Sequence, residues 1–191
     1  MQKLILASNS ARRQQLMREA GFHFTVEVLD VDESVDDAVE TADVAEYLAT
    51  KKNRAYRELF KNEVILTSDT VVVHQGQILG KPVDKEQAYD MISSLSGRVH
   101  QVISGVCISG PNHQLSFSDE TTVEFEVLSA EEINYYIKKY QPYDKAGSYG
   151  IQEWIGMIGV RSIQGSFYNV MGLPIHKVYQ TLKTEFDIVP D

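Results

Sequence analysis

Two arginines and two hydroxyl side chains are concentrated in a short segment near the start of the chain. Ser8, Ser10, Arg12 and Arg13 follow an apolar run, Leu4 to Ala7, and lead into a segment with helical periodicity. A helix N-terminus presents unpaired N–H groups, and arginine binds phosphate oxygens in a bidentate manner. The segment is therefore a candidate anion site. An ordinary helix cap followed by solvated arginines is the alternative, although arginines in a first turn oppose the helix dipole.

A carboxylate lies inside one of the most apolar parts of the sequence. Asp69, with Ser68 and Thr70 beside it, separates Val64 to Leu66 from Val71 to Val73. We expect a central strand that is interrupted or bent at this polar patch. A buried carboxylate is unfavourable unless it is paired or bound to a metal, so Asp69 is a candidate metal ligand or general base. An aspartate in a turn at the end of a strand is the alternative.

An acidic stretch, Asp30 to Asp43, has no apolar period and is expected to form a surface loop. Within it, Asp32 and Glu33 could supply a second carboxylate for Mg²⁺. The same residues could equally be a solvated run of charge. The next segment is expected to be a helix that carries Lys51 and Lys52.

Two further segments carry polar groups in constrained backbone. Lys81 lies between Gly80 and Pro82, a rigid turn suited to holding a phosphate, although a lone lysine often only solubilises the surface. The segment Asp144 to Gln152 combines a charge pair, two glycines and an amide, which suits close ligand approach and hydrogen bonds to a base edge. A glycine-rich turn held by an ion pair is the alternative.

The elements that position these groups follow from local pattern. Alternation and apolar runs predict strands at 4–7, 22–28, 64–73, 99–108, 115–127 and 158–163, with a hairpin turn at Gln75 and Gly76. Helical periodicity and capping residues predict helices over 13–20, after Asp43, after Asp84, from Ser129 to near Tyr140, and from Pro174 onward. The order of these elements predicts a mixed α/β fold.

Composition limits the functional classes. The 191 residues include 18 basic and 27 acidic side chains and have a net charge of −9, which argues against sequence-independent binding to nucleic acid or to an anionic membrane. Cys107 is the single cysteine and lies in an apolar run, which favours a buried, inert thiol over a nucleophile. No signal-peptide or membrane-spanning pattern is recognised, so a cytoplasmic protein is expected. His100 is interpreted as structural, because no zinc-ligand spacing accompanies it.

Seven segments occur in an order that resembles the Maf family of nucleoside triphosphate pyrophosphatases over essentially the whole chain. They are Leu6 to Arg13, Leu48-Ala49 with Lys52, Ser68 to Val72, Leu79 to Pro82, Ser96 to Val106, Asp144 to Gln152 and Gly165 to Pro174. The resemblance implies one domain over 1–191 with two lobes around a central cleft, similar to the inosine triphosphate pyrophosphatase architecture. It also implies Mg²⁺-dependent (or Mn²⁺-dependent) hydrolysis to a monophosphate and pyrophosphate.

The resemblance assigns roles residue by residue. Asp69 would accept the proton of the attacking water and could ligate the metal together with Glu33. The substrate-binding residues would be Ser8, Arg12, Arg13, Lys52, Thr70, Lys81 and Gln152. Two departures from the family pattern are Ala11, where proline is usual, and Ser68, where alanine is usual.

The segment Asp144 to Gln152, with Thr70, resembles the branch of the family that acts on dTTP and UTP. Two alternatives remain open: a pyrophosphatase for other modified nucleotides such as 7-methyl-GTP, and a non-catalytic nucleotide-sensing or division-associated binding protein. A carboxylate near the phosphates favours an enzyme over a binding protein. The resemblance is also compatible with a homodimer.

Overall fold

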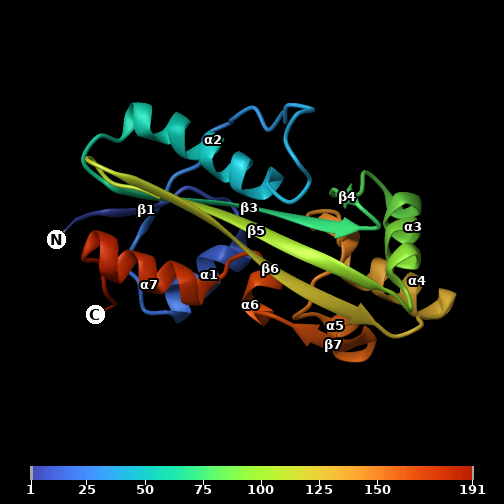
Figure 1. The fold of residues 1–191 in the computed structure, drawn as a ribbon. Helices are drawn as coiled ribbons and strands as arrows, with labels where there is room; N and C mark the ends of the chain where they lie inside the picture. Colours follow the sequence, from blue (N-terminus) through green and yellow to red (C-terminus); the bar gives the residue numbers. More distant parts are fainter. Residues whose placement is uncertain (1, 191) are drawn as a thin grey trace. The chain divides into compact units, whose positions relative to one another are not determined.

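The computed structural model describes residues 2–190 and contains a mixed sheet with flanking helices, which confirms the predicted α/β class (Figure 1). The strands are β1 (Leu4–Leu6), β2 (Thr25–Val26), β3 (Val64–His74), β4 (Gln77–Leu79), β5 (Val99–Ser109), β6 (Gln114–Phe125) and β7 (Val160–Gln164). Their order is β2-β1-β3-β5-β6-β7, and β4 pairs with β3. β1 is parallel to both β2 and β3, whereas the β3–β4 and β6–β7 pairs are antiparallel.

The helices are α1 (Ala11–Glu19), α2 (Val44–Leu59), α3 (Lys85–Leu95), α4 (Ala130–Tyr140), α5 (Trp154–Gly159), α6 (Phe167–Val170) and α7 (Ile175–Phe186), with a short 3₁₀ turn η1 (Ala146–Ser148). Several begin where the sequence predicts. The Asp84 side chain accepts a hydrogen bond from the backbone N–H of Gln87, and Ser129 forms a complete capping box with Glu132. At α2, Asp43 occupies the cap position without a side-chain cap bond, so its predicted capping role is wrong.

Strand β3 runs without a break from Val64 to His74, so the expected interruption at the polar patch is wrong. The patch stays in the strand because its polar groups have partners inside the protein. Thr67, which is fully buried, donates its hydroxyl to the backbone oxygen of Ala49 at 2.8 Å, so the strand needs no turn to solvate it. The predicted hairpin turn at Gln75 and Gly76 is confirmed, and both residues have positive φ.

Some other predicted elements differ from those in the structure. The predicted strand over 22–28 is reduced to the two residues of β2. Residue 158 belongs to α5 rather than to the following strand, and the sequence prediction missed both α5 and α6. These helices have six and four residues, which is too short for a 3.6-residue period to be recognised.

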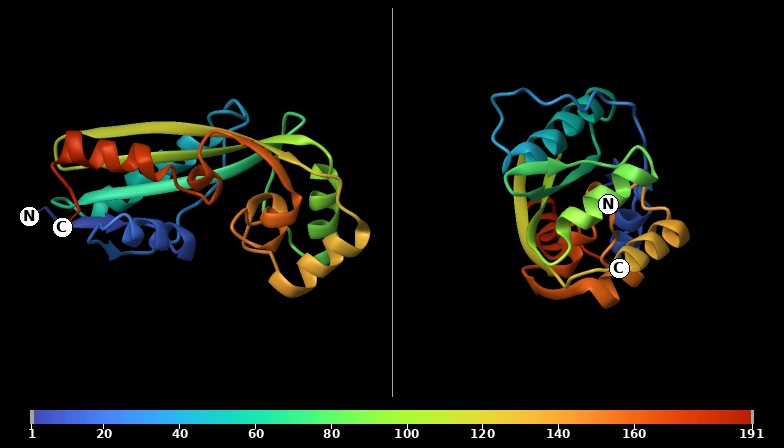
Figure 2. Two further views of the ribbon diagram at one scale, coloured as in Figure 1. Left: turned by 90° about the horizontal axis from the view of Figure 1, so that it is seen from below. Right: turned by 90° about the vertical axis from the view of Figure 1, so that its right-hand side faces the viewer.

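The chain divides into two compact units. The first comprises 1–70, 104–119 and 172–191, and the second comprises 71–103 and 120–171. Strands β3, β5 and β6 contribute residues to both units. In the first unit, α2 covers one face of the strands while α1 and α7 cover the other, as the two further views also show (Figure 2). In the second unit, α3 and α4 lie side by side.

The face under α2 is packed very closely. A Cβ atom on Gly105 of β5 would lie 2.2 Å from the backbone carbon of Ala45 and 2.2 Å from the backbone nitrogen of Glu46. Only glycine allows the N-terminal turn of α2 to approach the strand to this distance. Among residues 2–190, no helix combines the length and the apolar character that crossing a bilayer would require.

Candidate active site

The loop between β1 and α1 is organised by its two serines. The Ser10 side chain accepts from the backbone N–H of Arg13 at 3.4 Å, and the Ser8 hydroxyl accepts from the backbone N–H of Ser10 at 3.2 Å. Ser10 is therefore the N-cap of α1, as the helix-cap alternative proposes. The first turn of α1 contains no acidic residue, so the two arginines there oppose the helix dipole.

The Arg13 side chain joins three segments of the first unit. Its Nε donates to the backbone oxygen of Gly172 at 2.8 Å, one terminal nitrogen donates to the backbone oxygen of Ser68 at 2.8 Å, and the other donates to the Thr70 hydroxyl at 3.1 Å. Burial lowers the pKa of Arg13 from its ordinary value, whereas the nearby Asp69 acts in the opposite direction. Arg13 thus holds β3 and the segment before α7 against α1.

Thr70 belongs to the same arrangement. Its hydroxyl accepts from Arg13, lies 2.8 Å from the Ser104 hydroxyl, and lies 3.3 Å from the backbone oxygen of Gly172. With these neighbours inside the protein, the hydroxyl fixes the orientation of the Arg13 guanidinium.

Lys52 brings together two carboxylates from different parts of the chain. Its ammonium nitrogen lies 2.7 Å from Oδ1 of Asp69 on β3 and 2.7 Å from Oε1 of Glu33 in the acidic loop. The side chains of Lys52 and Asp69 are both 16% exposed, whereas that of Glu33 is 57% exposed. Partial burial reduces the screening of such charges by water, so this cluster is electrostatically stronger than an exposed ion pair.

The ion pair between Asp32 and Lys51, one residue before Glu33 and Lys52, lies outside the cluster at Asp69. Lys51 lies 2.8 Å from Asp32, whose side chain is 70% exposed. A hydrogen bond from Lys51 and further bonds from Ser34 hold the pKa of Asp32 well below its ordinary value. Asp32 is therefore directed away from Asp69 and toward Lys51, and of the two candidate acids in the loop only Glu33 shares Lys52 with Asp69.

The position of Lys52 on α2 depends on a residue that the sequence analysis did not select. Asn53 is fully buried, and its side-chain nitrogen donates to the backbone oxygens of Ile65 and Cys107, each at 3.1 Å. These bonds fix α2 against β3 directly beside Lys52. Positions 45, 49, 53 and 56 of α2 recur at helical spacing and are buried. A polar residue at one of these apolar-face positions is the sequence signal that could have identified Asn53.

The donor set at Asp69 and Glu33 fits a hard divalent cation. Magnesium prefers oxygen ligands and is commonly held by one or two carboxylates together with substrate phosphates. Two carboxylates on one cation meet that description. Within residues 2–190 no group of three or more His, Cys, Asp or Glu side chains that could hold a metal ion is found.

The other two predicted substrate residues belong to the second unit. Lys81 and Gln152 are both exposed, and neither side chain has a hydrogen-bond or ion-pair partner in the described part of the chain. Arg12 is half-buried in the first unit. The structure therefore brings Ser8, Arg13, Glu33, Lys52, Asp69 and Thr70 together in the first unit, whereas Lys81 and Gln152 belong to the second unit.

Two residues interpreted as structural are buried. His100 is 2% exposed, its Nε2 lies 2.7 Å from the Tyr149 hydroxyl, and burial lowers its pKa to about 4. Cys107 is fully buried, and burial raises the pKa of its thiol to about 12. A thiol held in its protonated form is a poor nucleophile, which confirms the interpretation of Cys107 as inert.

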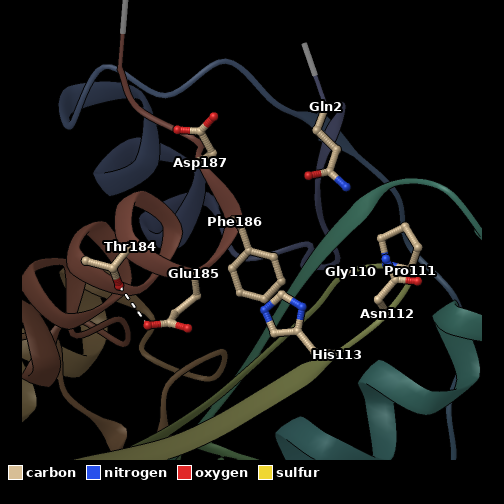
Figure 3. A pocket seen from close by; sticks show the side chains of 9 residues that line it. All are labelled: Gln2, Gly110, Pro111, Asn112, His113, Thr184, Glu185, Phe186 and Asp187. Atoms are coloured by element: carbon tan, nitrogen blue, oxygen red, sulfur yellow. Dashed lines mark hydrogen bonds between the residues drawn. The ribbon is translucent and has the colours of Figure 1, made fainter.

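A separate hollow of 320 Å³ lies in the first unit, between the β5–β6 turn and the end of α7 (Figure 3). The His113 ring stacks on Phe186 there, with 4.5 Å between the ring centroids. The residues that line the hollow are Gln2, Gly110, Pro111, Asn112, His113, Thr184, Glu185, Phe186 and Asp187. None of the predicted site residues is among them, and most of the lining is exposed, so this hollow is not the candidate active site.

The family model and the curated relatives that this chain resembles point to the same family. Residues 3–185 match a family model described as Maf-like protein. The chain is 52% identical over 183 residues to the dTTP/UTP pyrophosphatase of Bacteroides thetaiotaomicron, with 95% of each chain covered. It is 47% identical over 185 residues to the protein of the same name from Porphyromonas gingivalis, with 95% and 93% covered.

Solved structures are more distant. The chain is similar to the Ham1 protein of Staphylococcus aureus at 15% identity and a TM-score of 0.45, with 65% of this chain and 72% of the other covered. It is also similar to a nucleoside-triphosphatase, dITP/XTP pyrophosphatase, of Mycobacterium abscessus at 11% identity and a TM-score of 0.41, with 67% and 76% covered.

Proposed function

The chain belongs to the Maf family, and from this we propose that it hydrolyses dTTP and UTP to the nucleoside monophosphate and pyrophosphate. The observation that carries the proposal is the cluster in which Lys52 lies 2.7 Å from both Asp69 and Glu33. It combines a carboxylate suited to act as a base, a second carboxylate suited to a metal, and a cation suited to phosphate. The names of relatives that are about half identical over nearly their whole length support the same substrates.

Asp69 is the proposed general base. Its carboxylate would accept a proton from a water molecule whose oxygen attacks the α-phosphorus in line with the bond to the β-phosphate oxygen. A new P–O bond forms, the bond to the β-phosphate oxygen breaks, and pyrophosphate leaves with the electron pair. The position of Asp69 on a continuous strand fixes the carboxylate relative to the segments that Arg13 joins.

Glu33 and Asp69 are the residues that would hold Mg²⁺ or Mn²⁺. Such an ion neutralises charge that develops on the triphosphate oxygens, which is the usual contribution of a metal to phosphoryl chemistry. Lys52 already lies against both carboxylates, so the cluster accommodates positive charge at this place.

The proposed triphosphate-binding residues are the Ser8 hydroxyl and the cationic side chains of Arg12, Arg13, Lys52 and Lys81. Lys81 belongs to the second unit and the others belong to the first. Because three N–H groups of Arg13 bond the protein, we assign it a double role: it orients the loop and contributes long-range attraction to phosphate. Thr70 would act through Arg13, whose guanidinium it contacts.

Gln152 would recognise the base. Uracil and thymine present an N3–H donor beside the O4 acceptor, and a side-chain amide can pair with both groups at once. The exposed and unpartnered Gln152 side chain is available for this contact. We further propose that the two units form one functional domain over 1–191. A homodimer and a cytoplasmic location remain predictions.

The test is a measurement of pyrophosphate release from dTTP, UTP, the other canonical triphosphates and 7-methyl-GTP, with Mg²⁺ and with Mn²⁺. The expected result is turnover that is highest with dTTP and UTP. Highest turnover with 7-methyl-GTP or a purine nucleotide would favour the alternative substrate class. Tight nucleotide binding without pyrophosphate release would identify a binding protein instead.

A further inference from the structure

The loop that carries Gln152 is unusually well fixed for an exposed recognition residue. Between Lys145 and Glu153, Gln152 is the one residue classed as exposed, and most of the others are buried. A Cβ atom on Gly147, whose φ is +65°, would lie 3.0 Å from Val72, and one on Gly156 of α5 would lie 1.8 Å from the backbone oxygen of Ile151. The backbone on both sides of Gln152 therefore has little room to move.

A buried polar cluster holds the end of this loop. We call it the Glu153 network, and it consists of Tyr136, Lys145 and Glu153. The Tyr136 hydroxyl donates a short hydrogen bond to the Glu153 carboxylate, and Lys145 lies 3.2 Å from the same carboxylate. The side chain of Lys145 is 8% exposed and that of Glu153 is 19% exposed, while Tyr136 is fully buried.

The network also holds the loop backbone directly. The backbone N–H of Gly150 donates to the Tyr136 hydroxyl at 3.0 Å. A Cβ atom on Gly150 would lie 2.9 Å from the carboxyl carbon of Glu153 and 3.1 Å from a carbon of Lys145, so both side chains of the network pack directly on the Gly150 backbone. Burial and the bond to Glu153 raise the pKa of Tyr136 above its ordinary value, so its hydroxyl stays protonated as a donor.

The same loop is bonded to the turn that carries Lys81. The backbone N–H of Gly147 donates to the backbone oxygen of Gly80 at 3.0 Å. The backbone beside the proposed phosphate ligand Lys81 and that beside the proposed base-recognition residue Gln152 thus belong to one hydrogen-bonded assembly. Their two side chains are exposed while the backbone that carries them is fixed.

The position of Gln152 matters because its chemistry alone selects too little. Guanine presents an N1–H donor beside the O6 acceptor, the same pair that uracil presents at N3–H and O4. An amide can pair with either base. Discrimination must then come from where the amide stands, since a purine extends farther from the sugar than a pyrimidine does.

We propose that the Glu153 network is a positioning device that fixes the place of Gln152 and thereby sets the preference for a pyrimidine over the larger purine. The proposal rests on the proposed dTTP/UTP pyrophosphatase function. Tyr136, Lys145 and Glu153 act through Gln152 and are positioning residues.

The test compares kcat/KM for UTP with kcat/KM for GTP in Tyr136→Phe, which removes the hydroxyl and keeps the ring. Loss of hydrogen bonds to a positioned group is expected to lower the UTP-to-GTP ratio about tenfold, mainly through a higher KM for UTP. Tyr135→Phe is the matched control on the same helix. Within residues 2–190 the Tyr135 hydroxyl bonds only the exposed Lys139, so its loss should leave the ratio unchanged. A merely structural role would lower both kcat/KM values in proportion and leave the ratio constant.

A double-variant cycle with Gln152→Ala identifies the route. If the network acts through Gln152, then adding Tyr136→Phe to Gln152→Ala lowers the ratio no further. An equal effect of Tyr136→Phe in both backgrounds, or an unchanged ratio in folded Tyr136→Phe protein, would overturn the proposal. If the Tyr136→Phe protein does not fold, the same ratio is measured for Glu153→Gln, which removes the charge of the carboxylate that Tyr136 and Lys145 contact.

The outcomes also separate the two proposals. If the unsubstituted protein releases no pyrophosphate from UTP, the proposed function fails, and this inference fails with it. If it hydrolyses UTP in preference to GTP but the Tyr136→Phe ratio is unchanged, only the positioning role is wrong.

Discussion

The ammonium nitrogen of Lys52 lies 2.7 Å from the Asp69 carboxylate, and this contact joins the middle of α2 to the middle of β3. The two side chains are equally and only slightly exposed. The same ammonium contacts Glu33, so three charged side chains from a loop, a helix and a strand form one cluster. Two predictions concern this cluster, and two concern buried positions elsewhere in the protein.

Asp69→Asn should abolish turnover while nucleotide binding is largely kept. Asparagine has nearly the same shape but cannot accept the proton of water, and loss of a general base lowers kcat by about 100-fold to 10,000-fold. Pyrophosphate release from dTTP measures turnover, and calorimetric titration with a non-hydrolysable analogue measures binding. Turnover near that of the unsubstituted protein would refute the assignment of Asp69.

Glu33→Gln should raise the Mg²⁺ concentration needed for half-maximal activity about tenfold or more, because neutralising a ligand weakens a carboxylate metal site. Asp32→Asn is the control, since Asp32 is adjacent in sequence but pairs with Lys51. The measurement is activity against Mg²⁺ concentration after removal of metal with a chelator. Equal effects of the two substitutions would show that Glu33 has no special relation to the metal.

Gly105→Ala should destabilise the protein by about 3 kcal/mol or more, because the new methyl group would overlap the backbone of α2 and neither element can easily move. Gly80→Ala is the control, since a Cβ there has no neighbour within 4 Å and the backbone has no positive φ. Urea unfolding monitored by circular dichroism gives both free energies. A Gly105→Ala protein as stable as the Gly80→Ala protein would contradict the close packing of α2 on β5.

Stability should fall as pH is lowered from 6.5 toward 4 because of His100. Its pKa is lowered from 6.5 to about 4 in the folded protein, so in this interval the unfolded chain binds a proton that the folded chain does not. The linkage reduces the free energy of unfolding by about 2 kcal/mol between pH 7.5 and pH 5. The stability that neutral, buried His100 contributes is therefore fully present above pH 6.5, the pKa in the unfolded chain. It is lost as the pH falls to about 4, the pKa in the folded protein.

The measurement for His100 is the free energy of unfolding against pH, compared with that of His100→Gln. The difference between the two curves should shrink toward low pH. Parallel curves for His100→Gln would contradict the burial of a neutral imidazole.

Local sequence pattern accounts for much of the scaffold. Buried strands such as β1 and β3 are apolar runs in the sequence. Helices such as α3 and α4 are predicted by their capping residues and by a 3.6-residue period of apolar side chains. Asp69 stands out in the sequence as a candidate functional residue because a carboxylate inside an apolar run needs a partner. Short elements were missed because α5 and α6 contain less than two helical turns.

The fold class, the family and the candidate charged and hydroxyl side chains can be recognised from the amino-acid sequence, because they depend on local periodicity and on the order of motifs. The pairing of these groups is visible only in the folded protein: Glu33 rather than Asp32 shares Lys52 with Asp69, Arg13 bonds β3, and Tyr136 holds the loop of Gln152. The partners in each pair lie far apart in the chain, and they meet within their own unit because burial of the apolar helix faces packs those segments together.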